Sequence, residues 1–338
     1  MECLGMMMTK AMNIKFHPGR DDFIDRLFSY LTNRLPLEIL QLKQIRGNVF
    51  IVDTNKKSFI LKGYQNLSKL RIQQDLTASL KKTGFKETYR FYHFDDTPLL
   101  FENRYYGCIS YIAQNNQRFT YQSQAEREEG LGLLTNFHLT TEKLVSTYKG
   151  LIPTQNLIKK WRDRLQHFKV NRGIVNYYVP KEMTSWLYES AEIALLGMEK
   201  HKGDFQGRAP VILHGDVAHH NFIRSVSHEL YLIDFDLVSI GPASYDLLQY
   251  ANRILPFMNW SLDSLAKMEG FSEHFQDKAF LYGLMYPSDI FREWNRIIKL
   301  NSYYNPARVA PLMEMTVTQI NERKSFVESL KQEIISKK

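Results

Sequence analysis

The sequence predicts an α+β protein of two lobes: a small β-rich N-terminal lobe (residues 1–113) and a larger, mostly helical C-terminal lobe (residues 114–338). Apolar runs that suit paired strands are concentrated in the N-terminal part of the chain. Helical periodicity dominates after residue 123, and one β-rich island, residues 211–235, interrupts it. The polar stretch at residues 114–117 marks the boundary, and a cleft between two such lobes is a common place for a small ligand.

Length and composition fit a folded protein with a sizeable core. The chain has 338 residues, of which 44% are hydrophobic and 24% are charged, so it is too hydrophobic to be disordered. Its net charge of +8 allows nucleic acids, anionic surfaces or small anions such as nucleotides as partners. Because the chain has no long Lys/Arg run and no RNA-binding motif, we expect no nucleic-acid partner.

The sequence contains no pattern for targeting, membrane insertion or disulfide bonding. The apolar stretch at residues 1–12 is too short and broken for a signal peptide. No window holds the roughly 18 apolar residues of a membrane span. Cys3 and Cys108 match neither a disulfide framework nor a metal-binding spacing. We therefore expect synthesis in the reducing cytoplasm and no membrane partner, and delivery to a later structure remains open.

The N-terminal lobe is expected to combine helices with a hairpin. Phe23, Leu27 and Leu31 form one stripe of a helix over residues 21–35, and Asp21 and Asp22 suit its first turn. We also expect strands at residues 49–52 and 58–61 around a polar turn, a helix at 67–82 that ends at Gly84, and a strand at 105–113.

The C-terminal lobe is expected to be built from helices. Ser123 and Glu126 form a capping-box pattern at the start of a helix that reaches His138. Further helices are predicted at residues 154–168, 181–200, 244–254, 275–284, 288–300 and 312–335.

The island at residues 211–235 contains the most informative motif of the chain. Its first apolar run leads into a His-Gly-Asp sequence that ends at Asp216, and Asn221 follows. A polar turn then leads to the second apolar run, which ends at Asp234. If the hairpin is symmetric, Asn221 and Asp234 lie opposite each other, with Cβ atoms roughly 5 Å apart.

These residue types suit phosphoryl transfer, which needs metal ligands for the polyphosphate and a carboxylate that orients the nucleophile. The amide oxygen of Asn221 and the carboxylate of Asp234 can share one Mg²⁺, and Asp216 can accept the proton of an attacking hydroxyl group. Two alternatives stay open. His-Gly-Asp is also an ordinary turn, and His219 and His220 allow a zinc site with Asp216, although no Cys or HExxH partner accompanies them.

The spacing H-G-D-x-x-x-x-N followed by I-D-F resembles the catalytic motifs of protein kinases. Its His-Gly-Asp form is similar to that of aminoglycoside phosphotransferases, choline kinases and homoserine kinases. The resemblance implies a protein-kinase-like bilobal fold with ATP and Mg²⁺ as cofactors. We expect His214 to brace the catalytic loop rather than to act as a base. Asp246 lies in a segment similar to one in aminoglycoside-type kinases, where the Asp opens a helix and also braces that loop. The helix dipole alone also favours an acid there.

A kinase of this type needs a lysine on its third strand, and Lys62 follows the strand predicted at residues 58–61. Alternation along the strand puts Ile60 and Lys62 on one face, where Ile60 would cover the adenine and Lys62 would meet the phosphates. The alternative is a surface lysine at a strand end. The next helix should supply an acid that holds the lysine, and Asp75 lies at the expected place, where a Glu is usual. Of a Gly-rich loop only residues 46–49 remain.

A closer resemblance rests on residues 214–222, on the run that ends at Asp236, and on residues 246–256. These segments resemble the spore coat kinase-like proteins, the CotS group, and within it the YsxE-like branch of endospore-forming bacteria. The resemblance covers the chain from about residue 20 to its end. It implies expression during sporulation and association with the spore coat, where other coat proteins would be partners.

Three functions fit these observations. The first is an ATP-dependent phosphotransferase for a small-molecule hydroxyl group, which the complete set of lysine, catalytic Asp and metal ligands favours. The second is a structural coat component that keeps the kinase fold with little or no turnover, which Asp75 and the missing Gly-rich loop favour. The third is a protein kinase for coat proteins, which is disfavoured by Gly215 in place of an arginine and by the lack of an A-P-E element. No pattern identifies the acceptor.

Overall fold

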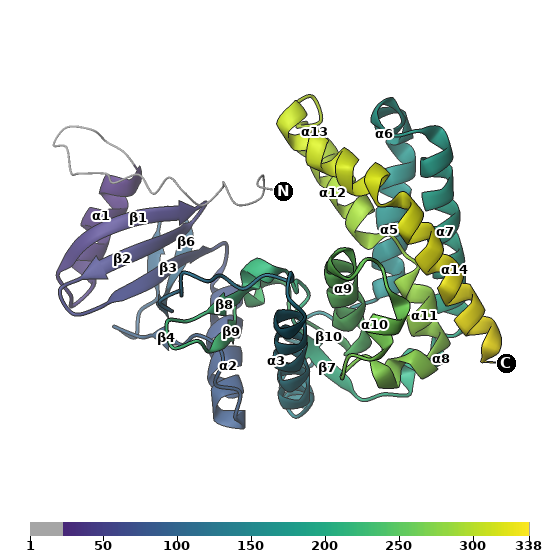
Figure 1. The fold of residues 1–338 in the computed structure, drawn as a ribbon. Helices are drawn as coiled ribbons and strands as arrows, with labels where there is room; N and C mark the ends of the chain where they lie inside the picture. Colours follow the sequence, from purple (N-terminus) through teal and green to yellow (C-terminus); the bar gives the residue numbers. More distant parts are fainter. Residues whose placement is uncertain (1–22, 338) are drawn as a thin grey trace. The chain divides into compact units, whose positions relative to one another are not determined.

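The computed structural model describes residues 23–337, which form two compact units (Figure 1). Unit 1 contains the described residues up to Arg118 and the segment Ile223–Asp236, and unit 2 contains Phe119–Phe222 and the described residues from Leu237 onward. Unit 1 is rich in strands and unit 2 in helices, so the predicted α+β class is confirmed. Cys3, Asp21, Asp22 and the stretch at residues 1–12 lie outside the described residues.

Unit 1 is built on an antiparallel sheet with the strand order β1-β2-β3-β6-β4, in which β5 also pairs with β6. Helices α1 and α2 belong to the same unit. The bounds are α1 (Phe23–Arg34), β1 (Ile39–Arg46), β2 (Val49–Thr54), β3 (Ser58–Tyr64), α2 (Leu67–Thr83), β4 (Phe91–Tyr92), β5 (Leu99–Phe101) and β6 (Arg104–Ser110).

Strand alternation explains how the sheet of unit 1 is stabilised. Phe50 of β2 and Phe59 and Leu61 of β3 are fully buried and belong to one cluster with Leu27 and Leu31 of α1. Burial of each such side chain contributes about 1.5–3 kcal/mol. The other face of β3 therefore carries Ile60 and Lys62, both only half-buried.

The helix and strand limits of unit 1 follow local signals. The side chain of Asn66 caps α2 by accepting a hydrogen bond from the backbone N of Lys69, and Gly84 ends the helix at φ 113°, in the left-handed region that glycine tolerates best. The helix predicted to end at Gly84 is thus confirmed. Strand β6 ends at Ser110, three residues before the predicted limit at residue 113.

A short hairpin, β8 (Phe222–Arg224) and β9 (Leu230–Leu232), folds with unit 1 although a long helical stretch separates it from the sheet in the sequence. The backbone N of Asn115 donates to the carbonyl oxygen of Arg224 at 2.8 Å, and the N of Leu232 donates to that of Glu87 at 2.9 Å. The division predicted at residue 113 assigns this hairpin to the C-terminal lobe. In the structure, these two hydrogen bonds join the hairpin to unit 1.

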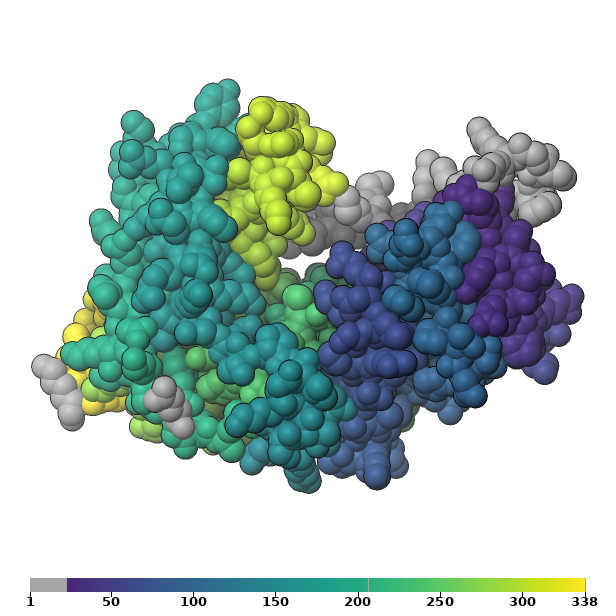
Figure 2. All heavy atoms as spheres, turned by 180° about the vertical axis from the view of Figure 1, so that it is seen from behind, coloured from purple at the N-terminus to yellow at the C-terminus, as the bar shows by residue number. Residues whose placement is uncertain are grey.

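Unit 2 consists of helices and a two-stranded antiparallel ladder of β7 and β10. Figure 2 shows from behind how the teal helical segments of unit 2 lie beside its yellow-green segment near α13. The bounds are α3 (Gln124–Glu142), α4 (Val145–Tyr148), α5 (Leu157–Val170), α6 (Arg172–Tyr178), α7 (Lys181–Lys200), α8 (Gly203–Gln206), β7 (Pro210–Leu213), β10 (Ser239–Pro242), α9 (Ser244–Ile254), α10 (Leu262–Ala266), α11 (Lys278–Leu284), α12 (Ser288–Lys299), α13 (Pro306–Met313) and α14 (Ile320–Ser336).

The core of unit 2 joins α5 to the segment between α11 and α12. The rings of Trp161 and Tyr286 stack with centroids 4.4 Å apart, and the Tyr286 hydroxyl donates to the carbonyl oxygen of Trp161 at 2.6 Å. The bidentate ion pair of Arg323 with Asp289 ties α14 to α12 in the interior, where both side chains are almost fully buried. Among the residues described, no helix is long and apolar enough to span a membrane.

Several predicted helices of unit 2 differ from the structure at their ends, and α5 and α11 begin later than predicted, at Leu157 and Lys278. The capping box at Ser123 and Glu126 is confirmed, and α3 extends past His138 to Glu142. The single helix predicted at residues 312–335 is wrong, because a π-helical segment, Glu314–Thr318, separates α13 from α14. Within that segment the Thr316 hydroxyl donates to the carbonyl oxygen of Leu312 and accepts from Trp294 Nε1, so a buried side-chain contact holds the irregular turn.

Candidate active site

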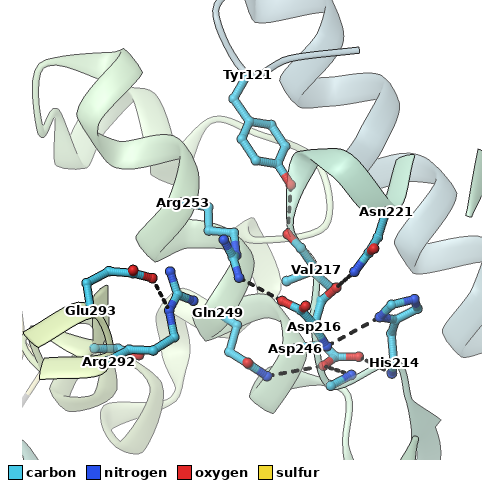
Figure 3. A network of polar contacts seen from close by, with 12 residues as sticks. Tyr121, His214, Asp216, Val217, Asn221, Asp246, Gln249, Arg253, Arg292 and Glu293 are labelled. Carbon is cyan, nitrogen blue, oxygen red and sulfur yellow. Dashed lines mark hydrogen bonds and ion pairs between the residues drawn. The ribbon is translucent and has the colours of Figure 1, made fainter. Parts of the chain in front are cut away.

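The loop between β7 and β8, residues 214–221, carries the His-Gly-Asp motif and belongs to unit 2 (Figure 3). Asp246, in the first turn of α9, is completely buried beneath it. The Asp246 carboxylate accepts hydrogen bonds from the backbone N of His214 at 2.6 Å and from that of Gly215 at 3.0 Å. His138 Nε2 lies 3.0 Å from the same carboxylate. Asp246 therefore fixes the backbone of the loop from below.

The pKa of Asp246 is lowered although burial alone would raise it. The hydrogen bond and the charge contributed by His138, followed by the contributions of His214, outweigh the desolvation. The carboxylate is thus kept ionised in the interior, where both of its oxygens accept hydrogen bonds.

Gly215 has a conformation that no other residue type would accept easily. Its φ is +81°, and a Cβ atom built there would lie 2.3 Å from the carbonyl oxygen of Leu237. The glycine is required both by the left-handed backbone and by the close approach of a neighbouring chain segment. This is a physical reason for His-Gly-Asp in place of the His-Arg-Asp of protein kinases.

Asp216 presents a side chain that is 35% exposed and that Arg253 of α9 holds in place. Arg253 Nη2 donates to Asp216 Oδ1 at 2.7 Å, and Figure 3 marks this contact with a dashed line. Burial, and then the neighbouring charge of Arg292, lowers the pKa of Arg253 to about 10, so the guanidinium remains charged at neutral pH. The Tyr121 hydroxyl donates to the carbonyl oxygen of Val217 at 2.7 Å, which fixes the backbone beside Asp216.

His214 and Asn221 complete the loop. His214 is fully buried, and its Nδ1 accepts a hydrogen bond from the backbone N of Asp216 at 3.3 Å. Asn221 Nδ2 donates to the carbonyl oxygen of Asp216 at 2.8 Å, which orients its amide group. Its Oδ1 is buried and has no hydrogen-bond partner among the described residues. An oriented, unpartnered oxygen of this kind fits a ligand of a hard cation such as Mg²⁺.

In unit 1, Lys62 lies between two carboxylates. Its Nζ donates to Asp234 Oδ1 and to Asp236 Oδ1, both at 2.7 Å. Arg46, the last residue of β1, donates to Asp234 Oδ2 at 3.0 Å. Ile60 lies two residues before Lys62 on the same face of β3. The cluster thus gathers two cations around the carboxylate that the sequence assigns to metal binding.

Asp75 does not take the place that the sequence analysis gave it. It is exposed on α2, and the lysine is held by Asp234 and Asp236 instead. The α2 side chain that faces this cluster is the buried Gln73, whose Nε2 donates to Asp236 Oδ1 at 2.5 Å. The helical periodicity explains the difference, since Gln73 shares a buried stripe with Leu70 and Leu76, and Asp75 falls outside it.

The hydroxyl groups of Tyr64 and Tyr89 both donate to Gln73 Oε1 at 3.2 Å. Burial, followed by nearby negative charges that include Asp234 and Asp236, raises the pKa of both tyrosines well above its usual value. They therefore act as neutral donors that orient the Gln73 amide toward Asp236.

Asn221 and Asp234 lie outside strands β8 and β9, so the ladder of the hairpin does not pair them as predicted. The backbone N of Ser225 donates to the carbonyl oxygen of Glu229, so the hairpin is centred on residue 227 and its strands are short. Asn221 ends a 3₁₀ turn before β8, and Asp234 follows β9 with a φ of 71°. Asp is one of the few non-glycine residues that tolerate this left-handed conformation.

His219 and His220 are exposed on the loop. Among residues 23–337, no three His, Cys, Asp or Glu side chains form a group that could hold a metal ion. Cys108 is buried in unit 1, and burial raises its pKa to about 12.

Several residues of these clusters were missed by reasoning from sequence. Arg253 could have been found, because it lies seven residues after Asp246 and helical spacing places both on one face of α9. Gln73 could also have been found from the sequence, because it lies on the buried stripe of α2. Tyr121 and His138 carry no local signal, because only the tertiary fold brings them to the loop.

Comparisons with known proteins place these observations in context. Residues 132–283 match the model of the phosphotransferase enzyme family (APH). No curated protein matches the sequence. Among solved structures, an aminoglycoside phosphotransferase from Alicyclobacillus acidocaldarius is similar with a TM-score of 0.70 at 16% identity, over 90% of this chain and 95% of that chain.

Two further structures were determined with ligands. Spectinomycin phosphotransferase, in complex with ADP and spectinomycin, is similar with a TM-score of 0.51 at 15% identity, over 94% of this chain and 99% of that chain. The GDP and kanamycin complex of APH(2")-IIIa is similar with a TM-score of 0.57 at 12% identity, over 89% of this chain and 98% of that chain. The chain therefore has the kinase-like α+β fold of the aminoglycoside phosphotransferases, and its residues 132–283, which include the His-Gly-Asp loop, match the phosphotransferase enzyme family.

Proposed function

We propose that this protein transfers the γ-phosphoryl group of ATP to a hydroxyl group of a small molecule. The observation that carries the proposal is the loop at residues 214–221. There Asp216 is held at the surface by Arg253, and the amide oxygen of Asn221 has no partner within the part of the chain that the structure describes. The family match over residues 132–283 supports it, as does the fold shared with proteins whose structures contain ADP or GDP.

In the proposed reaction Asp216 is the general base. It accepts the proton of the acceptor hydroxyl group while the acceptor oxygen forms a bond to the γ-phosphorus. The bond between the γ-phosphorus and the bridging oxygen breaks, and ADP leaves with that oxygen. Such a base contributes about 10²–10⁴-fold to the rate. Arg253 is a positioning residue, because it acts on the reaction through Asp216.

Asn221 and Asp234 are the proposed Mg²⁺ ligands, and Lys62 is the proposed phosphate contact. Bound Mg²⁺ would neutralise charge on the phosphate oxygens. Asp234 fits this role through its carboxylate and Asn221 through its unpartnered Oδ1. Lys62 and Arg46 already contact carboxylate oxygens, and phosphate oxygens are acceptors of the same kind.

A second candidate is a structural protein that keeps this fold with little turnover. The observation that favours it is the neutral Gln73 on the face of α2 where active kinases place an acid for the lysine. From the sequence resemblance we further propose expression during sporulation and a place in the spore coat with other coat proteins as partners. Both candidates share that location, so catalysis has to separate them.

The nucleotide site is tested by the variant Asp234→Asn. Asparagine tolerates the left-handed backbone at this position, so the change removes the charge without forcing a new fold. The melting temperature is measured with ADP, with Mg²⁺ and with both. Bound nucleotide stabilises the parent by about 2.7 kcal/mol at a hundredfold excess over Kd.

We expect Asp234→Asn to lose the Mg²⁺-dependent part of this stabilisation. Asp75→Asn, which removes an exposed acid of the same unit, is the matched control and should respond like the parent. An Asp234→Asn protein that ADP and Mg²⁺ stabilise as strongly as the parent would show that Asp234 is not a metal ligand.

A further inference from the structure

Unit 2 contains an open cleft of about 650 Å³ between the N-terminal end of α5 and helix α12. Its volume falls in the range of small-molecule sites. The lining is polar and basic, with Gln155, Lys159, Lys160, Arg164, Arg292 and Asn295 among its residues.

The positive charge of this cleft is largely uncompensated. The side-chain ammonium groups of Lys159 and Lys160 have no hydrogen-bond or ion-pair partner among the described residues. Arg164 donates to Ser288, at 2.9 Å to the hydroxyl oxygen, and within residues 23–337 it forms no ion pair with a carboxylate. Arg292 is paired with Glu293, and Asp163 is the acid of the lining.

The cations of the cleft disfavour one another in the absence of an anion. Burial, and then the charge of Arg164, lowers the pKa of Lys160, and burial likewise lowers the pKa of Arg164. Unpaired, partly desolvated cations are costly unless something neutralises them.

Two buried polar atoms in the lining also lack partners among the residues described. They are Gln155 Nε2 and Asn295 Oδ1. The other end of each amide is fixed, since Gln155 Oε1 accepts from the Ser239 hydroxyl and Asn295 Nδ2 donates to the carbonyl oxygen of Arg164. A fixed donor and a fixed acceptor beside cations suit a ligand that carries both hydroxyl groups and an anionic group.

The cleft is close enough to Asp216 for their charges to interact. Asp216 and Asp246 both act to raise the pKa of Lys160. The charge of Arg292, a lining residue, helps to lower the pKa of Arg253, and Figure 3 shows Arg292 beside Arg253, on the side away from Asp216.

We propose that this cleft binds the acceptor and that the acceptor is an anionic polyol, a hydroxylated small molecule that carries a carboxylate or a phosphate group. The inference rests on the proposed phosphotransferase function and assigns its substrate class. Lys160 and Arg164 would hold the oxyanion, and the two amides would contact hydroxyl groups. A ligand that carries amino groups in place of the anionic group would be repelled by the same cations.

The proposal is tested by calorimetric binding of four probes to the full chain: glucuronate, glucose 6-phosphate, glucose and kanamycin. We expect one or both anions to bind, with an affinity that falls as salt is added, and glucose and kanamycin to bind far more weakly. The carboxylate and phosphate probes identify the source of the oxyanion. Lys160→Gln should weaken anion binding about tenfold, because a hydrogen bond to a charged group is lost.

Arg162→Gln is the matched control, since it removes a cation of the same helix whose side chain is 57% exposed and lies outside the cleft lining. Glucose or kanamycin binding as tightly as the anions would overturn the proposal, as would the failure of both anions to bind. An equal loss of ADP·Mg²⁺ stabilisation in Lys160→Gln would assign the cleft to nucleotide phosphates instead. If ADP and Mg²⁺ do not stabilise the parent but the anions still bind to it, the proposed function is contradicted and the anion-binding cleft is not.

Discussion

At the residue scale, two left-handed backbone positions shape the clusters. Gly215 allows the loop to pass the carbonyl oxygen of Leu237, and Asp234 turns the chain directly after β9. Such positions cost about 1–3 kcal/mol for a non-glycine residue and persist where the surrounding structure enforces them.

The variant Gly215→Ala tests the first of these positions. A Cβ atom there would meet the Leu237 carbonyl oxygen, and the left-handed backbone alone costs about 1–2 kcal/mol. We expect a larger loss than that in the free energy of unfolding, measured with urea. Gly132→Ala, in α3 with open space around its Cα, is the control and should be neutral or stabilising. Equal stability of Gly215→Ala and the parent would contradict the described loop.

Lys62 is the second residue with a sharp prediction. Its side chain is 13% exposed and separates two carboxylates, so Lys62→Met should abolish the nucleotide response and also cost about 1–3 kcal/mol of stability through the loss of two charge-assisted hydrogen bonds. Lys56→Met, on the exposed β2–β3 turn, should do neither. The measurement is the melting temperature with and without ADP and Mg²⁺. If these ligands raise the melting temperature of Lys62→Met as much as that of the parent, Lys62 lies outside the nucleotide site.

At the element scale, α9 holds the catalytic loop. Asp246, Gln249 and Arg253 lie on one face of this helix, and each contacts a partner shown in Figure 3. One helix therefore fixes both the backbone of the loop and the side chain of Asp216.

The buried carboxylate of this helix makes stability depend on pH. Because the folded-state pKa of Asp246 is lowered, its contribution is present above the unfolded value of about 3.9 and is lost as the pH falls through the folded value. We expect Asp246→Asn to cost about 3 kcal/mol or more at pH 7. Its stability should also decline less steeply than that of the parent below pH 5. Urea unfolding across this range measures both, with the exposed Asp263→Asn as control; parallel curves would contradict the assignment.

Local signals predicted most elements but not all of the contacts between them. The alternation in β2 and β3 and the caps of α2 and α3 depend on neighbouring residues, so they are readable from the sequence. The pairing of Lys62 with Asp236 depends on residues that are far apart in the chain, and the shorter hairpin depends on a register that polar turns specify weakly. The split of the 312–335 helix depends on a buried contact of Thr316.

At the scale of the whole molecule, each unit brings part of the proposed chemistry. Unit 1 groups Lys62, Arg46 and Asp234, and unit 2 groups Asp216, Arg253 and Asn221. The proposed function requires both groups, whereas a purely structural protein would need neither exposed carboxylate nor unpartnered amide.

The central claim is that Asp216 is the base of a phosphotransferase. The most direct measurement is the rate of ADP formation from ATP·Mg²⁺ with the anionic acceptor probes, compared between the parent, Asp216→Asn and the control Asp263→Asn. The Asn oxygen can still accept the hydrogen bond from Arg253, so the loop should persist. We predict that Asp216→Asn loses about 10²–10⁴-fold in acceptor-dependent rate, while ADP·Mg²⁺ stabilises it as it does the parent. Equal rates in the parent and Asp216→Asn, at equal nucleotide affinity, would contradict the account.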